Sequence, residues 1–445
     1  MSPNTREKTK SKGAALWDKA KTLIPGGNQL LSKRAEMFLP GQWPAYYEKA
    51  KGVDVWDLDG RRLTDMSIMG IGTCILGYAD DAVNQAVKRA IDQGSMCTLN
   101  CPEEVALAEK LIELHPWAGM ARFARTGGEA CTIAVRIARA ASGKDKVAFC
   151  GYHGWGDWYL SANLADSKNL DGQLLPGLEP LGVPRALKGT SYPFTYGKLE
   201  ELVRIFQSNP GEIGVVIMEV GRNQAIDVAF LQSVRDLAHK NGAVLIFDEV
   251  TSGFRISTGG MHRLYGVDPD IVILGKALGN GFPIAAVLGR TEVMNAAQST
   301  FISSTYWTER VGFAAALEVI RQFESRKVAA HITEISRRLV EGLKKIFGQL
   351  RLQIEMGGIT AIPAMLIHEP DPLVVKTVFT QEMLKRGYLA STAIYLSLAH
   401  TPEIIDRYLA AAGEVFATIA KHSSAGTLES ALEGPVCHSG FKRLT

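Results

Sequence analysis

The feature that most limits the fold is a regular alternation, between about residues 76 and 310, of helical patterns with short and wholly apolar runs. Such alternation is typical of α/β domains with a largely parallel sheet, because a strand buried on both faces reads as a continuous apolar run. In the clearest unit a helical pattern from Ala229 stops at Asn241-Gly242, and the apolar run 243–247 ends in Asp248. We therefore expect an α/β fold with a mostly parallel central sheet.

Polar residues follow other predicted strands in the same way. The apolar runs 146–150, 214–218 and 271–274 are followed closely by Tyr152, Glu219 and Lys276. The carboxyl ends of parallel strands meet at one edge of the sheet, which is where open α/β sheets bind ligands. We expect these side chains to share one site with Asp248.

The two ends of the chain have a different pattern. Residues 14–70 combine a helix-like start, Pro25-Gly26-Gly27 and a hairpin pattern over 46–66 that turns at 57–60. From about 311 onward come two long helical patterns, a strand-like stretch at 361–367 and helices near 374–386 and 402–421. We predict a large domain over 76–310, and a smaller α+β domain built from both chain ends, 1–75 and 311–445.

Composition excludes several classes of function. With 46% hydrophobic residues, 21% charged residues and a net charge of +3, the chain lacks the basic surface of a nucleic-acid partner. No apolar run is long enough to cross a membrane, and the basic start lacks the apolar core of a signal peptide. The six cysteines lack the paired spacing of a zinc site. We expect reduced thiols, no metal and a cytoplasmic location.

Two segments could bind a charged ligand. Thr126, Gly127 and Gly128 begin a helical pattern, whose first N–H groups form a phosphate cradle, although a plain turn before a helix reads the same way. Asp248 ends a strand in an apolar setting, where a carboxylate needs a cation or several donors. A helix cap or a structural ion pair is the alternative interpretation of Asp248.

Two further segments could carry the reaction. Lys276 follows a buried strand amid glycines, and a desolvated lysine is a nucleophile for carbonyl groups. A surface lysine is the alternative, but it leaves the apolar flanks unexplained. Tyr152, in Tyr-His-Gly, could stack on a flat ligand or merely fill space. Together the four segments suit pyridoxal 5′-phosphate, which needs a phosphate site, a ring stack, a lysine for the Schiff base and a carboxylate on its ring nitrogen.

The order and spacing of these motifs resemble the class III aminotransferases of pyridoxal phosphate fold type I. Within that family the chain is most similar to the glutamate semialdehyde aminomutase branch. The resemblance spans nearly the whole chain, and its motifs are Ile24-Pro25-Gly26-Gly27, the hairpin Val55-Trp56-Asp57-Leu58-Asp59-Gly60, Tyr152-His153-Gly154, DEVTSGFR from Asp248, LGKALGNGFP from Leu274 and Ser397-Leu398-Ala399-His400.

The resemblance implies a role for each matching residue. Lys276 would form the Schiff base and Asp248 would bind the ring nitrogen. A threonine at the position of Thr305 reaches the phosphate of the neighbouring subunit in the family, which implies a homodimer. The remaining cofactor contacts would be Thr126, Gly127 and Gly128 on the phosphate, Tyr152 and Val250 on the two ring faces, and Glu219 and Asn223 near the ring hydroxyl and the substrate.

The departures from the family lie on the substrate side. Arg125 replaces the asparagine that usually precedes the phosphate motif, so its role is open. Arg34 is the candidate for binding a substrate carboxylate, and Thr392 stands where the aminomutases have an acidic residue. These changes favour an aminotransferase that moves an amino group from an amino-acid donor to an aldehyde or ketone, sugar-like acceptors included. A glutamate-1-semialdehyde 2,1-aminomutase-type isomerase is the second interpretation. A non-catalytic cofactor-binding protein is the third, against which the intact Lys276–Asp248 pair argues.

Overall fold

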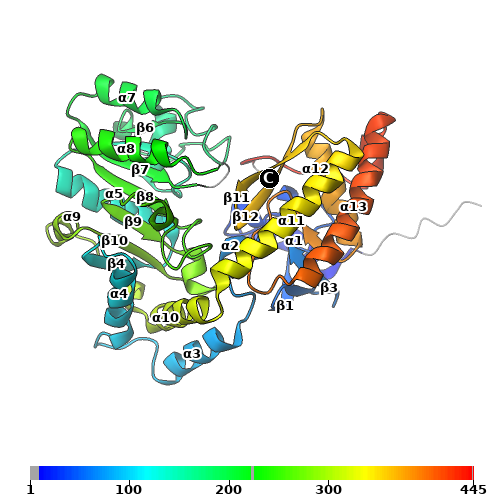
Figure 1. Cartoon of the computed structure of the whole chain (residues 1–445), viewed down its shortest axis with the longest axis horizontal. Helices are drawn as coiled ribbons and strands as arrows, with labels where there is room; N and C mark the ends of the chain where they lie inside the picture. The colour runs from blue at the N-terminus through cyan, green and yellow to red at the C-terminus, as the bar shows by residue number, and fades with distance from the viewer. Residues whose placement is uncertain (1–9, 222–224, 443, 445) are drawn as a thin grey trace, which may run out of the picture.

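The computed structural model describes residues 10–221, 225–442 and 444. The chain forms a larger and a smaller lobe (Figure 1). The larger lobe contains a sheet in the order β4-β10-β9-β8-β7-β5-β6, in which β10 runs antiparallel to both neighbours and the run from β9 to β6 is parallel. Its strands are β4 (Met120–Ala124), β5 (Lys146–Cys150), β6 (Ser191–Pro193), β7 (Ile213–Glu219), β8 (Val244–Glu249), β9 (Ile271–Leu274) and β10 (Ala285–Gly289). The predicted α/β fold is confirmed.

The central strands are buried on both faces. Every residue of β7 and β8 is buried, and consecutive residues of β7 alternate between two apolar cores, with Val215 and Ile217 in one and Val216 and Met218 in the other. Helix α5 (Gly127–Ser142) covers the first core, whereas α7 (Leu199–Ser208) and α8 (Val228–Lys240) cover the second. This double burial explains the uninterrupted apolar runs of the sequence.

The smaller lobe joins the two ends of the chain. Its sheet has the order β1-β2-β3-β13, and β13 pairs in parallel with β3 through Thr64 and Tyr388. The predicted hairpin is formed by β2 and β3, and Asp57 Oδ1 accepts the N–H groups of Asp59 and Arg61 at its turn. The strands are β1 (Tyr47–Lys51), β2 (Asp54–Asp57), β3 (Arg62–Met66) and β13 (Tyr388–Ala390), with a separate hairpin of β11 (Ile354–Ile359) and β12 (Ile362–Ile367).

The remaining helices complete both lobes. Helices α11 (Val328–Leu350) and α13 (Pro402–Ser424) pack on each other, and α12 (Pro372–Lys385) packs on α13 and β13. Helix α10 (Arg310–Ser325) packs instead on α3 (Asp81–Asp92) and α4 (Pro102–Leu114), which precede the sheet of the larger lobe in the chain. The domain boundary at 310/311 stays a prediction. The other α-helices are α1 (Lys12–Leu23), α2 (Met69–Gly72), α6 (Asp157–Leu160) and α9 (Thr291–Met294). No helix in the described ranges is both long enough and apolar enough to span a membrane.

One turn is strained. In α2 (Met69–Gly72) four consecutive residues have φ angles of 39°, 63°, 62° and 73°, and Met69 and Ile71 among them carry side chains. This left-handed backbone costs such residues ~1–2 kcal/mol each. The buried Arg255 donates hydrogen bonds to Gly72 O at 2.5 Å and to Thr251 O at 2.9 Å. The turn also packs against the 3₁₀ turn η6 (Lys276–Gly279), so the strain lies beside Lys276.

Candidate active site

The phosphate cradle predicted at Thr126, Gly127 and Gly128 is the N-terminus of α5. Thr126 is the N-cap: its Oγ1 accepts the N–H of Glu129 at 3.3 Å, and Glu129 Oε2 accepts the N–H of Thr126 at 2.9 Å. The first N–H groups of a helix have no acceptor within it and lie at its positive end, so an anion binds well there. A Cβ on Gly127 would lie 2.9 Å from Val250 Cγ1, so no side chain fits at this position.

The turn that carries Tyr152 lies directly against the cradle. Gly154 has a φ of 94°, and a Cβ at this residue would approach Gly128 Cα to 2.9 Å. The Tyr152 N–H donates a hydrogen bond to Glu219 Oε2 at 3.1 Å. Tyr152, which follows β5, and Glu219, which ends β7, are therefore brought together with the cradle.

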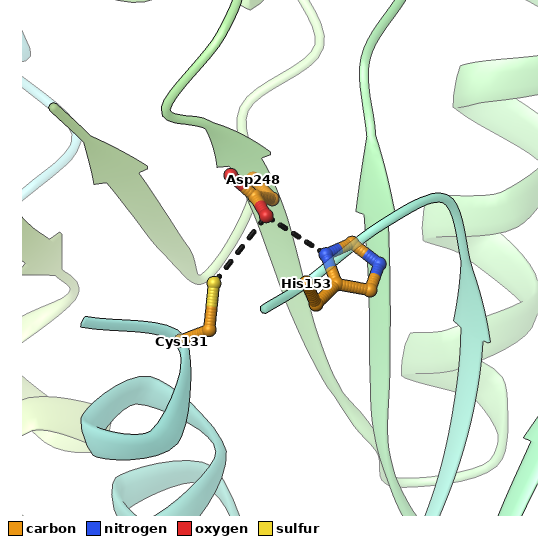
Figure 2. A group of neighbouring side chains, drawn as sticks. All are labelled: Cys131, His153 and Asp248. Carbon is orange, nitrogen blue, oxygen red and sulfur yellow. Dashed lines mark hydrogen bonds and ion pairs between the residues drawn. The ribbon is translucent and has the colours of Figure 1, made fainter. Parts of the chain in front are cut away.

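Asp248 lies at the end of β8 among three donors, and Figure 2 shows two of them. His153 Nδ1 is 2.8 Å from Asp248 Oδ2, the Cys131 thiol donates to the same oxygen at 3.3 Å, and the Val250 N–H donates to Oδ1 at 3.0 Å. His153 Nε2 faces Cys150 O at 3.1 Å. Both ring nitrogens thus face oxygen atoms that can accept a hydrogen bond. The carboxylate thus has the several hydrogen-bonding partners that its burial demands.

The charges of this cluster are set by burial and by hydrogen bonds. Burial alone would raise the pKa of Asp248, but the bond to His153, its positive charge, the Val250 amide and the Cys131 thiol together hold that pKa below its ordinary value. Burial and the charge of Asp248 raise the pKa of Cys131 well above its usual range, so Cys131 stays a thiol. The ligand-type atoms of the three side chains lie within 4.8 Å of one another, a spacing that their hydrogen bonds explain without a metal ion.

Lys276 begins the turn η6, directly after β9 and Gly275, with a φ of 43°. Its Nζ donates a hydrogen bond to Thr251 Oγ1 at 2.8 Å. A Cβ on Gly275 would lie 3.4 Å from Val250 Cγ1, the same atom that limits the space at Gly127. Val250 therefore touches both the cradle and the backbone next to Lys276, and the four predicted segments form one site.

Comparison with known proteins agrees with this geometry. Residues 40–387 match the family Aminotransferase class-III. The chain belongs to the class III aminotransferases. The 3-aminobutyryl-CoA aminotransferase of Cloacimonas acidaminovorans (strain Evry) is 31% identical over 420 residues, which cover 90% of this chain and 97% of that relative.

Solved structures share the fold of this aminotransferase. The FumI protein of Sphingopyxis sp. MTA144, in its PLP internal aldimine form, superimposes with a TM-score of 0.84 at 24% identity and covers 93% of this chain and 97% of its own. An omega-transaminase from Sphaerobacter thermophilus superimposes with a TM-score of 0.82 at 24% identity, covering 94% of this chain and 100% of its own.

The family uses pyridoxal phosphate and acts on small amino donors and keto acceptors. The site of this aminotransferase fits the cofactor on two counts. An Asp248 carboxyl group whose pKa is held below its ordinary value matches a protonated ring nitrogen, and the cradle without side chains at Gly127 and Gly128 matches a phosphate.

Two of the predicted site residues, Arg34 and Thr305, have other surroundings in the described part of the chain. Arg34 Nη1 donates to Lys442 O at 2.9 Å, and its guanidinium lies 5.7 Å from the centre of the Phe441 ring, so the C-terminal segment occupies it. Thr305 is exposed at the start of the 3₁₀ turn η8 (Thr305–Thr308). Asn223 lies outside the described residues.

From the sequence, a buried Asp248 is expected to need a cation or several donors, but the pattern does not identify which residues supply them. Cys131 lies four residues after Gly127, which places it one helical turn further along α5 on the same face. His153 directly follows Tyr152. Helical spacing from the cradle was therefore the one available signal for Cys131.

Proposed function

We propose that this class III aminotransferase works through Lys276 and Asp248, and that it passes an amino group from an amino-acid donor to a separate aldehyde or ketone. The observation that carries the proposal is the position of Val250, which contacts the cradle at Gly127 and the backbone beside Lys276. Val250 also follows Asp248 closely and donates its N–H to that carboxylate. Val250 would thereby hold the phosphate cradle, the lysine and the carboxylate at fixed positions relative to one another.

Each residue of the site has a distinct part in this proposal. When bound, pyridoxal phosphate supplies an aldehyde and an electron-accepting ring. Lys276 would hold the cofactor through its ε-amine and, once displaced by a substrate amine, would carry a proton. Asp248, kept ionised by His153, would keep the ring nitrogen protonated. The other contacts would be Thr126, Gly127 and Gly128 on the phosphate, Tyr152 and Val250 on the ring faces, and Glu219 near the ring hydroxyl.

The role of Lys276 is tested by covalent trapping. The purified protein should be yellow, and borohydride reduction followed by peptide mapping should place the cofactor label on Lys276. Lys276→Ala should lose the reducible label, whereas Lys240→Ala, at the end of α8, should keep it. A label on any other lysine would overturn the assignment.

A single-turnover experiment separates transfer from isomerisation. A transferase releases its keto product before the acceptor binds, so a donor alone should change the absorbance of the bound cofactor and yield one keto acid per site. Glutamate and alanine are suitable donors. A β-amino thioester belongs in the panel because a relative is named 3-aminobutyryl-CoA aminotransferase. If no donor acts, but glutamate semialdehyde is isomerised without one, the chain is an aminomutase.

The proposal includes a homodimer in the cytoplasm. Exposed apolar side chains border the cradle and the turn η8: Trp155 is 74% exposed beside Gly128, and Tyr306 within η8 is 68% exposed. Phe301, held through its carbonyl by Arg136 of α5, is 83% exposed. Apolar side chains gathered in this way are typical of an interface with another protein. Six free thiols support a reducing compartment.

A further inference from the structure

Arg125 occupies an unusual position, directly before the N-cap Thr126. Its guanidinium binds three carbonyl groups of the segment that contains η8. Nε donates to Tyr306 O at 2.6 Å, and Nη2 donates to Trp307 O at 3.2 Å and to Glu309 O. A planar guanidinium can satisfy several acceptors at once in a fixed geometry, which an ammonium cannot do.

The Arg125 side chain is held firmly at this place. It is only 11% exposed, its guanidinium lies 4.9 Å from the centre of the Phe313 ring, and Nη2 is 3.8 Å from the Glu309 carboxylate. Burial lowers the pKa of Arg125, and the charge of Glu309 opposes this shift. Arg125 is therefore a desolvated cation fixed by backbone oxygens, unlike a solvated surface arginine.

A second contact joins the same two segments. Glu129 Oε2 accepts the N–H groups of Arg125 at 3.1 Å and of Thr126 at 2.9 Å, which fixes the N-terminus of α5. The other oxygen of this carboxylate accepts the indole N–H of Trp307, within η8, at 3.3 Å. The Glu129 carboxylate thus binds both the cradle and the η8 turn.

We propose that Arg125 is a positioning residue that joins the phosphate cradle and the η8 turn into one rigid unit, so that cofactor binding and subunit association favour each other. The inference rests on the proposed function, in which the cradle takes the phosphate and the apolar side chains around η8 lie at the interface with the second subunit. Coupling of this kind is reciprocal: because a homodimer has two cradles, the factor by which saturating cofactor tightens the dimer is the square of the factor by which dimerisation tightens cofactor binding at each site.

The test measures this coupling with the full chain. Sedimentation equilibrium gives the dimer dissociation constant without cofactor and with saturating pyridoxal phosphate, and the ratio of the two constants is the coupling. We expect the ratio to be about tenfold or more in the parent protein. In Arg125→Lys it should fall towards one, because one ammonium cannot span three carbonyl groups. Trp307→Phe, which removes only the hydrogen bond to Glu129, should lower the ratio less than Arg125→Lys does.

A matched control is available in α5. Arg136 Nη1 donates to Phe301 O at 3.0 Å, a carbonyl of the same stretch but outside η8, so Arg136→Lys should keep the parental ratio. Urea unfolding checks that each variant is folded. The inference is overturned if folded Arg125→Lys keeps the parental ratio, or if Arg136→Lys loses as much. Both outcomes leave the proposed function standing, whereas a parent protein that binds no cofactor or stays monomeric would overturn the proposed function as well.

Discussion

At the scale of single residues, the site depends on how Asp248 is kept ionised inside an apolar core. Its burial opposes the charge, and His153, Cys131 and the Val250 amide together outweigh that effect. The sequence could predict that Asp248 needs partners, because a buried carboxylate without them is costly. It could not predict His153, because the turn that delivers it depends on positive φ angles at Gly151 and Gly154 and on their packing against Glu219 and Gly128.

Asp248→Asn should keep the fold and bind some cofactor, but it should lose most of its turnover. A neutral amide cannot hold the ring nitrogen protonated, and a charge-assisted hydrogen bond contributes ~1.5–3 kcal/mol, or roughly one to two decades in rate. The measurement is steady-state turnover with a donor from the panel. The control is Asp236→Asn, whose carboxylate is 68% exposed on α8. Turnover equal to that of the parent would show that Asp248 has no such part.

At the scale of elements, the buried strands were predictable and the strained turn was not. The apolar runs at 146–150 and 271–274 have the bounds of β5 and β9, and those at 214–218 and 243–247 differ from β7 and β8 by one or two residues. By contrast, Met69 and Ile71 have no sequence preference for a left-handed backbone. Arg255 binds this turn through Gly72 O, and such a long-range contact leaves no periodic signal in the sequence.

His115, at the end of α4, should make the free energy of unfolding depend on pH. Its Nδ1 donates to Leu111 O at 2.8 Å, and its Nε2 accepts the Gly260 N–H at 2.9 Å, so the neutral ring joins α4 to a loop. Burial lowers its pKa from 6.5 to about 4. Between these values the unfolded chain binds more protons than the folded one, so the free energy of unfolding falls as the pH drops from 6.5 to 4, by up to about 3 kcal/mol.

Urea unfolding at pH 7 and pH 5 checks this expectation. His115→Gln should be less stable at pH 7 and should lose less stability between the two pH values than the parent does. Part of the dependence should remain, because burial also lowers the pKa of His400. His368→Gln is the control, since that ring is 57% exposed. An unchanged pH dependence in His115→Gln would contradict the assignment.

At the scale of the whole molecule, the proposed second subunit could not be predicted from the residue pattern of the chain alone. Thr305 is exposed at the start of η8. Among the contacts described for the single chain, its side chain makes none that would suggest a role. Only the family resemblance indicated that this residue serves a neighbouring phosphate. The apolar side chains around η8 add a structural reason to place the interface there.

Thr305→Ala should therefore weaken cofactor retention, although Thr305 is not part of the cradle of its own chain. The measurement is the cofactor remaining on the protein after dialysis, followed by absorbance. Ser303→Ala, a change at an exposed hydroxyl two residues earlier, should retain the cofactor as the parent does. A fully active monomer in sedimentation would exclude the shared site.

The pairing of β13 with β3 has a consequence for how the protein is made. A ribosome synthesises the chain from its N-terminus, so β1, β2 and β3 emerge first, whereas Tyr388, the partner of Thr64, emerges only after the whole of the larger lobe's sheet. Until then the outer edge of β3 offers unpaired backbone groups to any neighbouring nascent chain. The smaller lobe is thus completed only after residue 388 has been synthesised, and premature termination before this residue would leave this edge permanently open.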